Sequence, residues 1–586
     1  MQSLNKKKNL FSKQGLKESN TPLNKYLLGF IFCLTSSIAN AANDSLQRLK
    51  TFSLEDLAAV EVSILGKTAQ KIVDVPAAVY LLTAKQISQS GATNIPDLLR
   101  LVPGLHVAQL DANKWVVSSR GFSNRVTNKL LVMIDGRSIY SPLFGGVNWD
   151  QQNLMLEDIK QVEVIRGPGS SAWGANAVNG VINIVSKHSR DTQGSLISTL
   201  IGSEKAIVSL RQGGKLSDKA SYRVYAKHRQ HDESVFLDGT DATDSWNDVQ
   251  LGFRMDWQLS NNEQLTLQGD VYEGDLSERL TVPSFATPTL TDIQEDNIEV
   301  SGVNVLARWT KSYAKGSSNE LQVYFDHEKR DQWVIEETTD IFDVDYKYST
   351  RPMGQHALQL GAGYRYMSDS LPTGDLYSGQ VRMFAPNEKT VHLFNAFIQD
   401  EITLQEDAWW LTLGTKVEHN QYTGIEFQPS ARLHWKPADG HLLWGGLSRS
   451  VRTPSRFETD AFVLLDVIAV GPPPVALALQ GSRDLDSEIL TALEVGYRYH
   501  ANQQFMIDMA LFYQDYDKLM SFDQSGLISA PPPIAALAAV STLGNKMEGA
   551  SYGFELTTVW SPSPTFNLTA NYSYLQVDIS PKNSST

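Results

Sequence analysis

The chain has 586 residues, a formal net charge of −14 at pH 7, 42% hydrophobic residues and one cysteine. An acidic chain lacks the basic surface that contacts with nucleic-acid phosphates require, so we expect no nucleic-acid partner. The one cysteine, Cys33, lies in the N-terminal segment, so the rest of the chain has no thiol for a disulfide or a cysteine metal site.

The N-terminal segment is typical of a secretory signal. Lysines from Lys6 to Lys25 form a basic region, residues 26–34 are apolar, and the Ala-Asn-Ala of residues 39–41 fits the small-residue cleavage pattern. The apolar stretch is shorter than the roughly 20 residues of a membrane-spanning helix. We predict that residues 1–41 are a signal peptide; an uncleaved anchor is the alternative.

Residues 42–73 are expected to be a short leader, and residues 74–190 a compact α+β domain. In chain order, the pattern predicts a strand over 77–82, a helix capped by Thr83 with Gln86 in a capping box, and a helix over 97–101 with proline in its first turn. Further strands are predicted over 115–119, 129–134, 161–165 and 180–185, with a tight turn at Asp135-Gly136.

The stretch from Val162 to Lys187 is the most informative part of this domain. It contains a strand, a glycine-rich loop and a second strand, and an arginine stands at the first corner. A loose dinucleotide-binding pattern occurs here, but a strand follows it instead of a long helix, so we reject that interpretation. Glycine permits corners and close backbone approach. We expect corner glycines at Gly121, Gly167, Gly169, Gly174 and Gly180, and at Gly180 a close approach of the following strand to its neighbour.

From Gly194 onward the pattern changes to alternating apolar and polar residues, with aromatic residues near the strand ends. This pattern is typical of an antiparallel transmembrane β-barrel, and we predict about 17 strands over residues 191–586. Two long connections resemble each other, residues 470–479 and 529–538, and both are apolar. We expect them to pack on each other and cap the mouth; contact with an apolar ligand or a protein is the alternative.

Four short motifs of this first domain are residues 96–104, Arg120-Gly121-Phe122, residues 134–137 and residues 162–187. In this order they resemble the plug motifs of the TonB-dependent outer-membrane receptors. The resemblance covers nearly the whole chain after the signal. It implies a mainly β fold in which an α+β plug domain lies inside a barrel of about 22 strands. Since the chain ends in a polar tail with fewer predicted strands, we expect a truncated product that lacks C-terminal strands.

The resemblance also implies a TonB box, a short β-forming segment near the mature N-terminus that the TonB protein binds by strand addition. The alternating run of residues 60–64 is the best match, and residues 52–57 are its rival. The alternative is that residues 60–64 are simply the first strand of the plug. The members of the proposed box are Val60, Glu61, Val62, Ser63 and Ile64.

In the family, arginines equivalent to Arg120 and Arg166 meet two glutamates on the barrel wall. Alternation within the strands independently places Glu494 and Glu555 in the lumen, because their neighbours on both sides are apolar and must face lipid. We therefore predict that these four residues form a plug–barrel latch. The alternative is that both glutamates are ordinary hydrated lumen residues.

Ligand contacts are expected at the plug apices that face the outside. Aromatic and polar side chains there suit an anionic chelate or a planar ligand, although Trp149 could equally pack the plug top. The candidates are Trp115, Arg125, Phe144, Asn148 and Trp149. We find no catalytic motif and no metal-ligand spacing, so we expect neither an enzyme nor a cofactor.

We predict TonB-dependent import of a scarce ligand across the Gram-negative outer membrane, most often an iron-siderophore in this family. A receptor for cobalamin, haem, an oligosaccharide or another chelate is an alternative, as is a surface receptor without transport. The expected partners are TonB with its inner-membrane energising complex, a small extracellular ligand and outer-membrane lipid. We expect a monomer.

Overall fold

A computed structural model describes residues 61–62 and 70–582, apart from residues 286, 315, 373–381, 470–473, 502–503, 530–536 and 564–565. The predicted signal peptide, residues 52–57 and three residues of the predicted TonB box (Val60, Ser63 and Ile64) lie outside the described residues. In the part of the chain that is described, no helix is long and apolar enough to cross a membrane.

The plug domain is built on a five-stranded sheet with the order β3-β8-β9-β6-β7. Its strands are β3 (Val79–Thr83), β8 (Ile159–Arg166), β9 (Gly180–Ser186), β6 (Leu130–Ile134) and β7 (Arg137–Ser138). Strands β8 and β9 are antiparallel, whereas β6 and β9 are parallel. Strand β6 is an unbroken apolar run, as expected for a strand covered on both faces.

Apolar residues cover both faces of this sheet. Helices α4 (Ala84–Gln89) and α5 (Ile95–Leu99) contribute Ile87, Leu98 and Leu99 to the core on one face. On the other face, the strand β1 (Glu61–Val62) and the short helix η1 (Ile72–Asp74) pack with Val181 of β9. Residues 61–62 and 72–74 therefore lie against the plug sheet.

The smaller elements complete the plug. They are β2 (Gln70–Lys71), β4 (Leu105–Gln109), β5 (Trp115–Ser119), η2 (Trp149–Gln151), η3 (Leu156–Asp158), α6 (Ser170–Trp173) and η4 (Ser189–Thr192). The hairpin of β4 with β5 includes a strand, β4, that the sequence pattern did not predict.

Local signals placed several element ends correctly. The capping box of Thr83 and Gln86 is present, and the turn at Asp135-Gly136 joins β6 to β7 with both residues at positive φ. The prediction of a helix over 97–101 was wrong in its bounds. Helix α5 begins two residues earlier, because the Asn94 side chain accepts a hydrogen bond from the Asp97 amide and so caps the helix at that point.

In the second part of the chain, the described residues form one sheet of 20 strands that runs in chain order from β10 to β29. Its strands are β10 (Gly194–Ile201), β11 (Lys205–Ser217), β12 (Ala220–His231), β13 (Trp246–Ser260), β14 (Glu263–Pro283), β15 (Thr291–Ser312), β16 (Ser318–Gln332), β17 (Ile335–Ser349), β18 (His356–Ser370), β19 (Arg382–Phe384), β20 (Glu388–Gln405), β21 (Trp409–Asn420), β22 (Gly424–Trp435), β23 (His441–Arg452), β24 (Ala461–Ile468), β25 (Val475–Gln480), β26 (Glu488–Ala501), β27 (Phe505–Ser529), β28 (Leu537–Ser563) and β29 (Phe566–Pro581).

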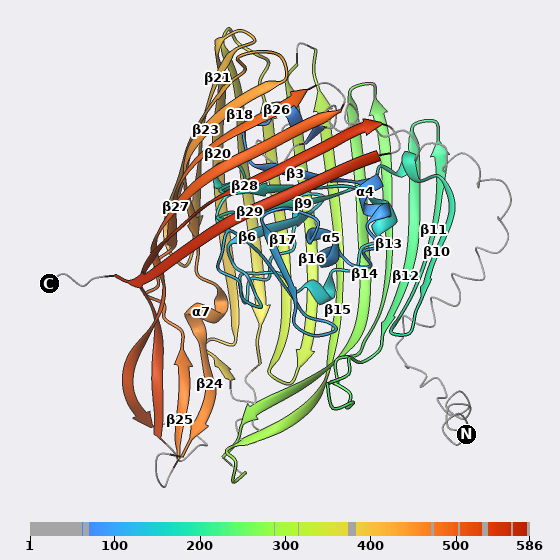
Figure 1. The fold of residues 1–586 in the computed structure, drawn as a ribbon. Coiled ribbons are helices and arrows are strands. Elements are labelled where there is room, and N and C mark those ends of the chain that lie inside the picture. Colours follow the sequence, from blue (N-terminus) through green and yellow to red (C-terminus); the bar gives the residue numbers. More distant parts are fainter. Residues whose placement is uncertain are drawn as a thin grey trace.

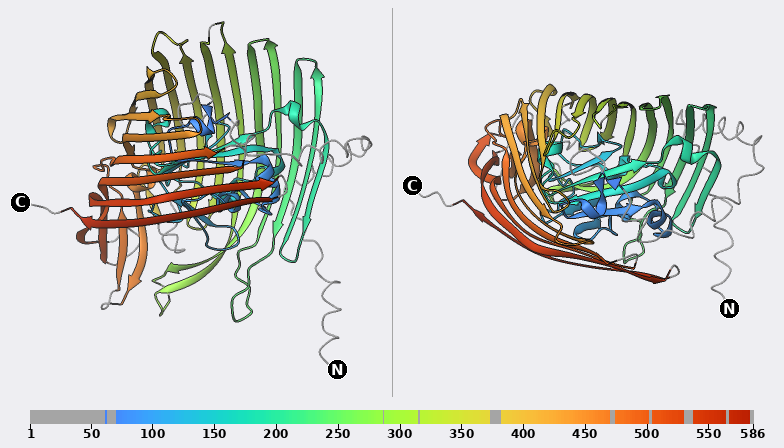
Figure 2. Two further views of the ribbon diagram at one scale, coloured as in Figure 1. Left: turned by 45° about the horizontal axis from the view of Figure 1, so that its top comes forward. Right: turned by 90° about the horizontal axis from the view of Figure 1, so that it is seen from above.

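The long sheet curls around the plug domain (Figures 1 and 2). Three of its 20 strands, β19, β24 and β25, are short and lie in long connections, since β18 pairs directly with β20 and β23 with β26. Leaving these three out gives 17 strands in the wall, in agreement with the predicted number. Among the described residues, no pairing joins β29 to β10.

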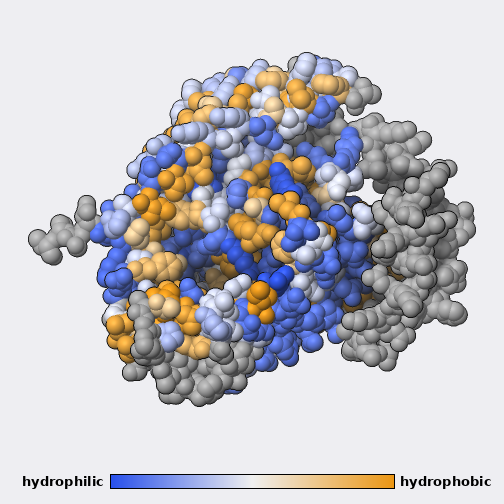
Figure 3. Space-filling view, turned by 60° about the horizontal axis from the view of Figure 1, so that its bottom comes forward, coloured by the Kyte–Doolittle hydropathy of each residue, from blue (hydrophilic) through white to orange (hydrophobic). Residues whose placement is uncertain are grey.

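The long connections gather at one end, where β24, β25 and the helix α7 (Arg456–Asp460) lie at the bottom of Figure 1. Long outer loops and short periplasmic turns are the usual asymmetry of such barrels, so this end faces outward. Strand β25 pairs in parallel with the start of β28, with Ala476 opposite Ala538. The expected packing of the two similar apolar connections is thus confirmed for their described parts. Figure 3 looks at this end and shows a hollow with hydrophilic residues, bordered by hydrophobic ones.

Candidate functional site

The four predicted latch residues meet in the interior of the molecule. Arg120 Nη1 lies 2.8 Å from Glu494 Oε1, and Arg120 Nε lies 3.2 Å from Glu555 Oε1. Arg166 Nη1 lies 3.3 Å from Glu555 Oε2 and also donates to the carbonyl of Pro103 at 3.2 Å. All four residues are at most 3% exposed. Their charges are therefore compensated within the cluster and not by water.

Backbone geometry aims both arginines at the wall. Arg120 follows β5 in the left-handed region (φ 54°), and Gly121 after it has φ 100°. Gly167, directly after Arg166, has φ 109°, and a side chain there would overlap the Glu494 carboxylate. Glycine at position 167 is thus required by conformation and by space. The wall contributes an aromatic contact as well, because the Arg120 guanidinium lies 4.0 Å from the ring centroid of Phe512.

The other predicted corner glycines differ in their roles. Gly174 has φ 91° and faces the Glu418 carboxylate, whereas Gly180 lies within β9, where a side chain would meet the Ile165 carbonyl. Gly169 lies in the corner between β8 and α6, but it is not among the glycines with positive φ. It is needed there for space, because a side chain would meet Val181.

Sequence reasoning missed a second buried ion-pair group next to the latch. The Lys129 ammonium on the plug pairs with Glu488 at the start of β26, and Glu488 also pairs with Arg452 at 2.9 Å. Burial lowers the pKa of Lys129, and the neighbouring Glu488 carboxylate opposes this shift. The alternation that placed Glu494 in the lumen also applies to Glu488, six residues earlier on the same face. The signal was therefore present in the sequence.

Two further barrel arginines reach the plug near the latch. Arg432 on β22 and Arg498 on β26 are buried and donate to backbone carbonyls of the plug. Alternation had placed Arg498 in the lumen, but it assigned no partner to it. Arg432 lies on the buried face of β22 together with Gln428, so a period-2 reading of that strand would have found it.

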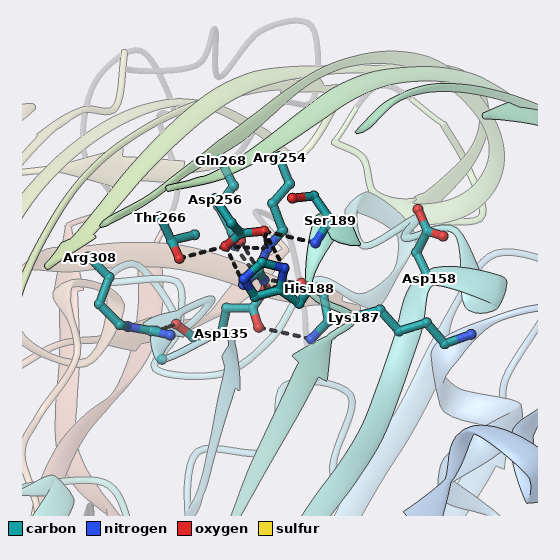
Figure 4. Close-up of polar contacts among 12 residues, drawn as sticks. Asp135, Asp158, Lys187, His188, Ser189, Arg254, Asp256, Thr266, Gln268 and Arg308 are labelled. Carbon is teal, nitrogen blue, oxygen red and sulfur yellow. Dashed lines mark hydrogen bonds and ion pairs between the residues drawn. The ribbon is translucent and has the colours of Figure 1, made fainter. Parts of the chain in front are cut away.

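A separate polar network holds the end of the plug sheet to β13 and β14 (Figure 4). The Asp135 carboxylate accepts hydrogen bonds from Ser186 Oγ at 2.7 Å and Gln268 Nε2 at 2.8 Å. Arg254 Nη1 donates to the same Ser186 hydroxyl, and its Nε lies 3.0 Å from Asp256. Burial raises the pKa of Asp135, but the guanidiniums of Arg254 and Arg308 and the Ser186 hydrogen bonds overcome that effect and hold the pKa below its usual value.

Between the plug and the barrel wall lies a polar cavity of about 220 Å³. The plug side includes Asp135 and Tyr140, and the wall contributes Arg308, Asn395 and Glu418. Charges of both signs face this space, so it is suited to water and not to apolar packing.

The candidate ligand residues do not share one surface. Trp115 and Trp149 are 3% and 6% exposed, so Trp115 does not present itself at an outer apex, and Trp149 agrees with the alternative that it packs the plug. The Trp115 ring packs 5.5 Å from Trp246 of β13, in the apolar core of the plug. By contrast, the Arg125 side chain is 45% exposed, 3.8 Å from Glu278.

Phe144 and Asn148 are half-buried at the outer end of the plug. The Phe144 ring lies 5.5 Å from that of Phe457 in α7, and the Phe457 amide donates to the carbonyl of Leu143. This apex is therefore in contact with the long outer connections.

The described part of the predicted TonB box is paired with the next segment. Glu61 lies opposite Lys71 and Val62 opposite Gln70 in an antiparallel ladder, and the Glu61 carbonyl accepts a hydrogen bond from Gln161 Nε2 at 3.1 Å. Val62 is buried against the plug sheet.

Comparisons with known proteins agree with this architecture. The model of the TonB-dependent receptor plug domain matches residues 71–181, and that of the TonB-dependent receptor-like β-barrel matches residues 198–586. A plug domain enclosed by a large antiparallel β-sheet wall is the architecture of an outer-membrane receptor. The chain belongs to the TonB-dependent receptor family, and it is an outer-membrane protein.

Similar proteins are receptors and transporters. The chain is 24% identical over 538 residues to the iron-regulated outer membrane virulence protein of Vibrio cholerae, covering 86% of this chain and 76% of the relative. It is 22% identical over 600 residues to the probable TonB-dependent siderophore receptor PirA of Acinetobacter baumannii, covering 90% and 76%. The crystal structure of that PirA has a TM-score of 0.69, 17% identity, and coverage of 86% and 81%.

Proposed function

We propose that this protein imports an iron-siderophore complex across the outer membrane with energy supplied through TonB. The observation that carries the proposal is the buried latch, in which two plug arginines meet two wall glutamates inside a TonB-dependent receptor fold. The choice of ligand is supported by the names of two relatives, one iron-regulated and one a probable siderophore receptor.

In this proposal the ion pairs of the latch hold the plug in place at rest and break during transport. Replacing a buried ion pair by apolar residues is often neutral, but removing one partner costs about 3–5 kcal/mol because the other charge stays buried. A cluster of this kind contributes little net stability while all its members are present. It is therefore suited to a seat that must be broken and re-formed.

Ligand capture is proposed at the outer end, where Arg125, Phe144 and Asn148 are at least partly accessible. An exposed guanidinium attracts an anionic ferric chelate and can bind its oxygen atoms with two parallel hydrogen bonds. The half-buried Phe144 adds apolar contact.

TonB binding is proposed at residues 60–64 by strand addition. Because Glu61 and Val62 are paired with Lys71 and Gln70 in the resting structure, binding requires these residues to exchange one strand partner for another. We also propose that residues 1–41 direct export and that the protein acts as a monomer in outer-membrane lipid.

The test is uptake of radioactive iron by iron-limited cells that lack this gene, with and without the gene restored. We expect one class of ferric siderophore to be taken up when the gene is present, and no such uptake when TonB is also deleted. Labelled vitamin B12 and haem are supplied in parallel. Gene-dependent uptake of either one without any iron-siderophore uptake would overturn the ligand assignment, and gene-dependent uptake that persists without TonB would overturn the energy source.

A further inference from the structure

The segment that joins the leader to the plug is gripped by two arginines of the barrel. Arg498 Nη1 donates to the carbonyls of Ile72 at 2.6 Å and Val75 at 2.9 Å, and its Nη2 donates to the carbonyl of Ala77 at 3.1 Å. Arg432 Nη1 donates to a fourth carbonyl of this segment, that of Pro76, at 3.1 Å. Four carbonyls within six consecutive residues are thus bound by the wall.

The chain at this point is shaped to present its carbonyls. Val75 precedes a proline and is extended, with φ −74° and ψ 118°, as steric contact with a proline ring favours. The segment leads directly into β3, whose Val79 pairs with Ile165 of β8, next to Arg166. The Arg166 amide itself donates to the carbonyl of Ala78 at 3.0 Å. A displacement of residues 72–77 therefore acts on the strand that ends at the latch.

Arg432 also contacts a latch residue. Its Nη2 lies 3.4 Å from Glu494 Oε2 and 3.2 Å from the carbonyl of Pro168, within the glycine corner. Glu494 is at the same time the partner of Arg120. One side chain thus touches the leader junction, the glycine corner and a latch carboxylate.

The charges of this cluster are unequal. Three guanidiniums, those of Arg120, Arg166 and Arg432, face two carboxylates, those of Glu494 and Glu555. Backbone carbonyls supply the other acceptors. If the Pro76 carbonyl is withdrawn, Arg432 keeps Glu494 and the Pro168 carbonyl as its acceptors and competes more strongly with Arg120 for Glu494. A buried guanidinium cannot lose its proton, so it must be satisfied by whatever acceptor is left.

We propose that Arg432 and Arg498 form a clamp that holds the leader junction at rest and transmits its withdrawal to the latch. Arg498 supplies most of the grip, and Arg432 links the grip to Glu494. Both are positioning residues, since they act through the plug and not on the ligand. Of the two experiments below, only the uptake measurement depends on the proposed function.

The first experiment measures the grip without a ligand. A reporter cysteine, Val73→Cys, is placed in the full chain with Cys33→Ser, and its rate of modification by a membrane-impermeant maleimide is measured in outer membranes that lack TonB. We expect Arg498→Gln and Arg432→Gln each to raise the rate about tenfold or more, because each removes charge-assisted hydrogen bonds to the segment. Arg330→Gln is the matched control. That buried wall arginine binds the plug at Asp150 and not at residues 72–77, so the rate should not change.

The second experiment separates coupling from plain support of the fold. In cells without TonB, Arg432→Gln should leave the outer membrane closed to large antibiotics, because Arg120 keeps Glu494 and Arg166 keeps Glu555. With TonB present, Arg432→Gln should lower the maximal uptake rate about tenfold at unchanged KM. Arg432→Lys should restore part of this rate, because lysine keeps the positive charge but cannot form two parallel hydrogen bonds as the guanidinium does. A structural role would instead raise leakage and lower the inserted amount.

The outcomes are distinct. Unchanged labelling in both arginine variants, or wild-type uptake in Arg432→Gln, would overturn the clamp. A wild-type protein that imports no ferric chelate would refute the proposed function, while the labelling experiment would still decide whether the clamp exists.

Discussion

The sharpest prediction concerns Glu555, which binds both plug arginines. The change Glu555→Gln keeps the shape of the side chain but removes the charge that faces Arg120 at 3.2 Å and Arg166 at 3.3 Å. Arg166 is then left with the Pro103 carbonyl, and its Nε has no hydrogen-bond partner among the described residues even in the native protein. Uncompensated burial of this kind costs about 3–5 kcal/mol.

This change raises the free energy of the seated plug relative to the displaced plug, because the arginines are hydrated once the plug is displaced. A change of about 3–5 kcal/mol shifts the ratio of seated to unseated plug by roughly two to four powers of ten. The assay is passive entry of a large glycopeptide antibiotic into cells that lack TonB, so that leakage is measured without transport. We expect Glu555→Gln to make such cells clearly more sensitive than cells with the native receptor.

The matched control is Glu337→Gln. Glu337 is a wall glutamate of similar burial, and it accepts a hydrogen bond from Thr339 on its own strand. Sensitivity should stay at the native value in this variant, with equal amounts of both proteins in the outer membrane. If Glu555→Gln is inserted normally and leaks no more than Glu337→Gln, the latch does not seat the plug.

Three further predictions follow from the same geometry. Gly167→Ala should lower the melting temperature more than Gly239→Ala. Both glycines have positive φ, but only at Gly167 would an added side chain meet other atoms, among them the Glu494 carboxylate. Equal decreases in melting temperature would refute the argument from space. Since the pKa of Asp135 is lowered in the folded protein, its contribution to stability is present above the unfolded value of about 3.9 and is lost as pH falls through the folded pKa. The difference in melting temperature between native protein and Asp135→Asn should therefore shrink towards strongly acidic pH, and a constant difference would contradict it. Trp115→Phe should leave the KM for ligand uptake unchanged, whereas Arg125→Ala should raise it; the opposite result would return Trp115 to the binding site.

The sequence predicted those features that depend on local or periodic signals. Thr83 and Gln86 are three residues apart, so their capping box needs nothing beyond the local chain. Alternation with a period of two decides which face of a strand meets lipid, which is why Glu494 and Glu555 could be placed in the lumen. The similarity of two distant connections likewise predicted that β25 and β28 would pack together.

How deeply a side chain is buried, and which residues it contacts, were decided by the tertiary structure. Alternation states that a residue faces inward, but it does not state what lies opposite, so Arg498 was placed in the lumen and its three carbonyl partners, 421 to 426 residues away, were not foreseen. Trp115 lies in a predicted strand, yet its burial against Trp246 depends on where the plug sits in the barrel. The face on which a strand residue lies follows from the period-two geometry of the strand backbone, so the local sequence is enough to predict it. The clamp and the burial of Trp115 depend on how the plug lies against the wall, and these contacts join residues far apart in the chain, so no local pattern predicts them.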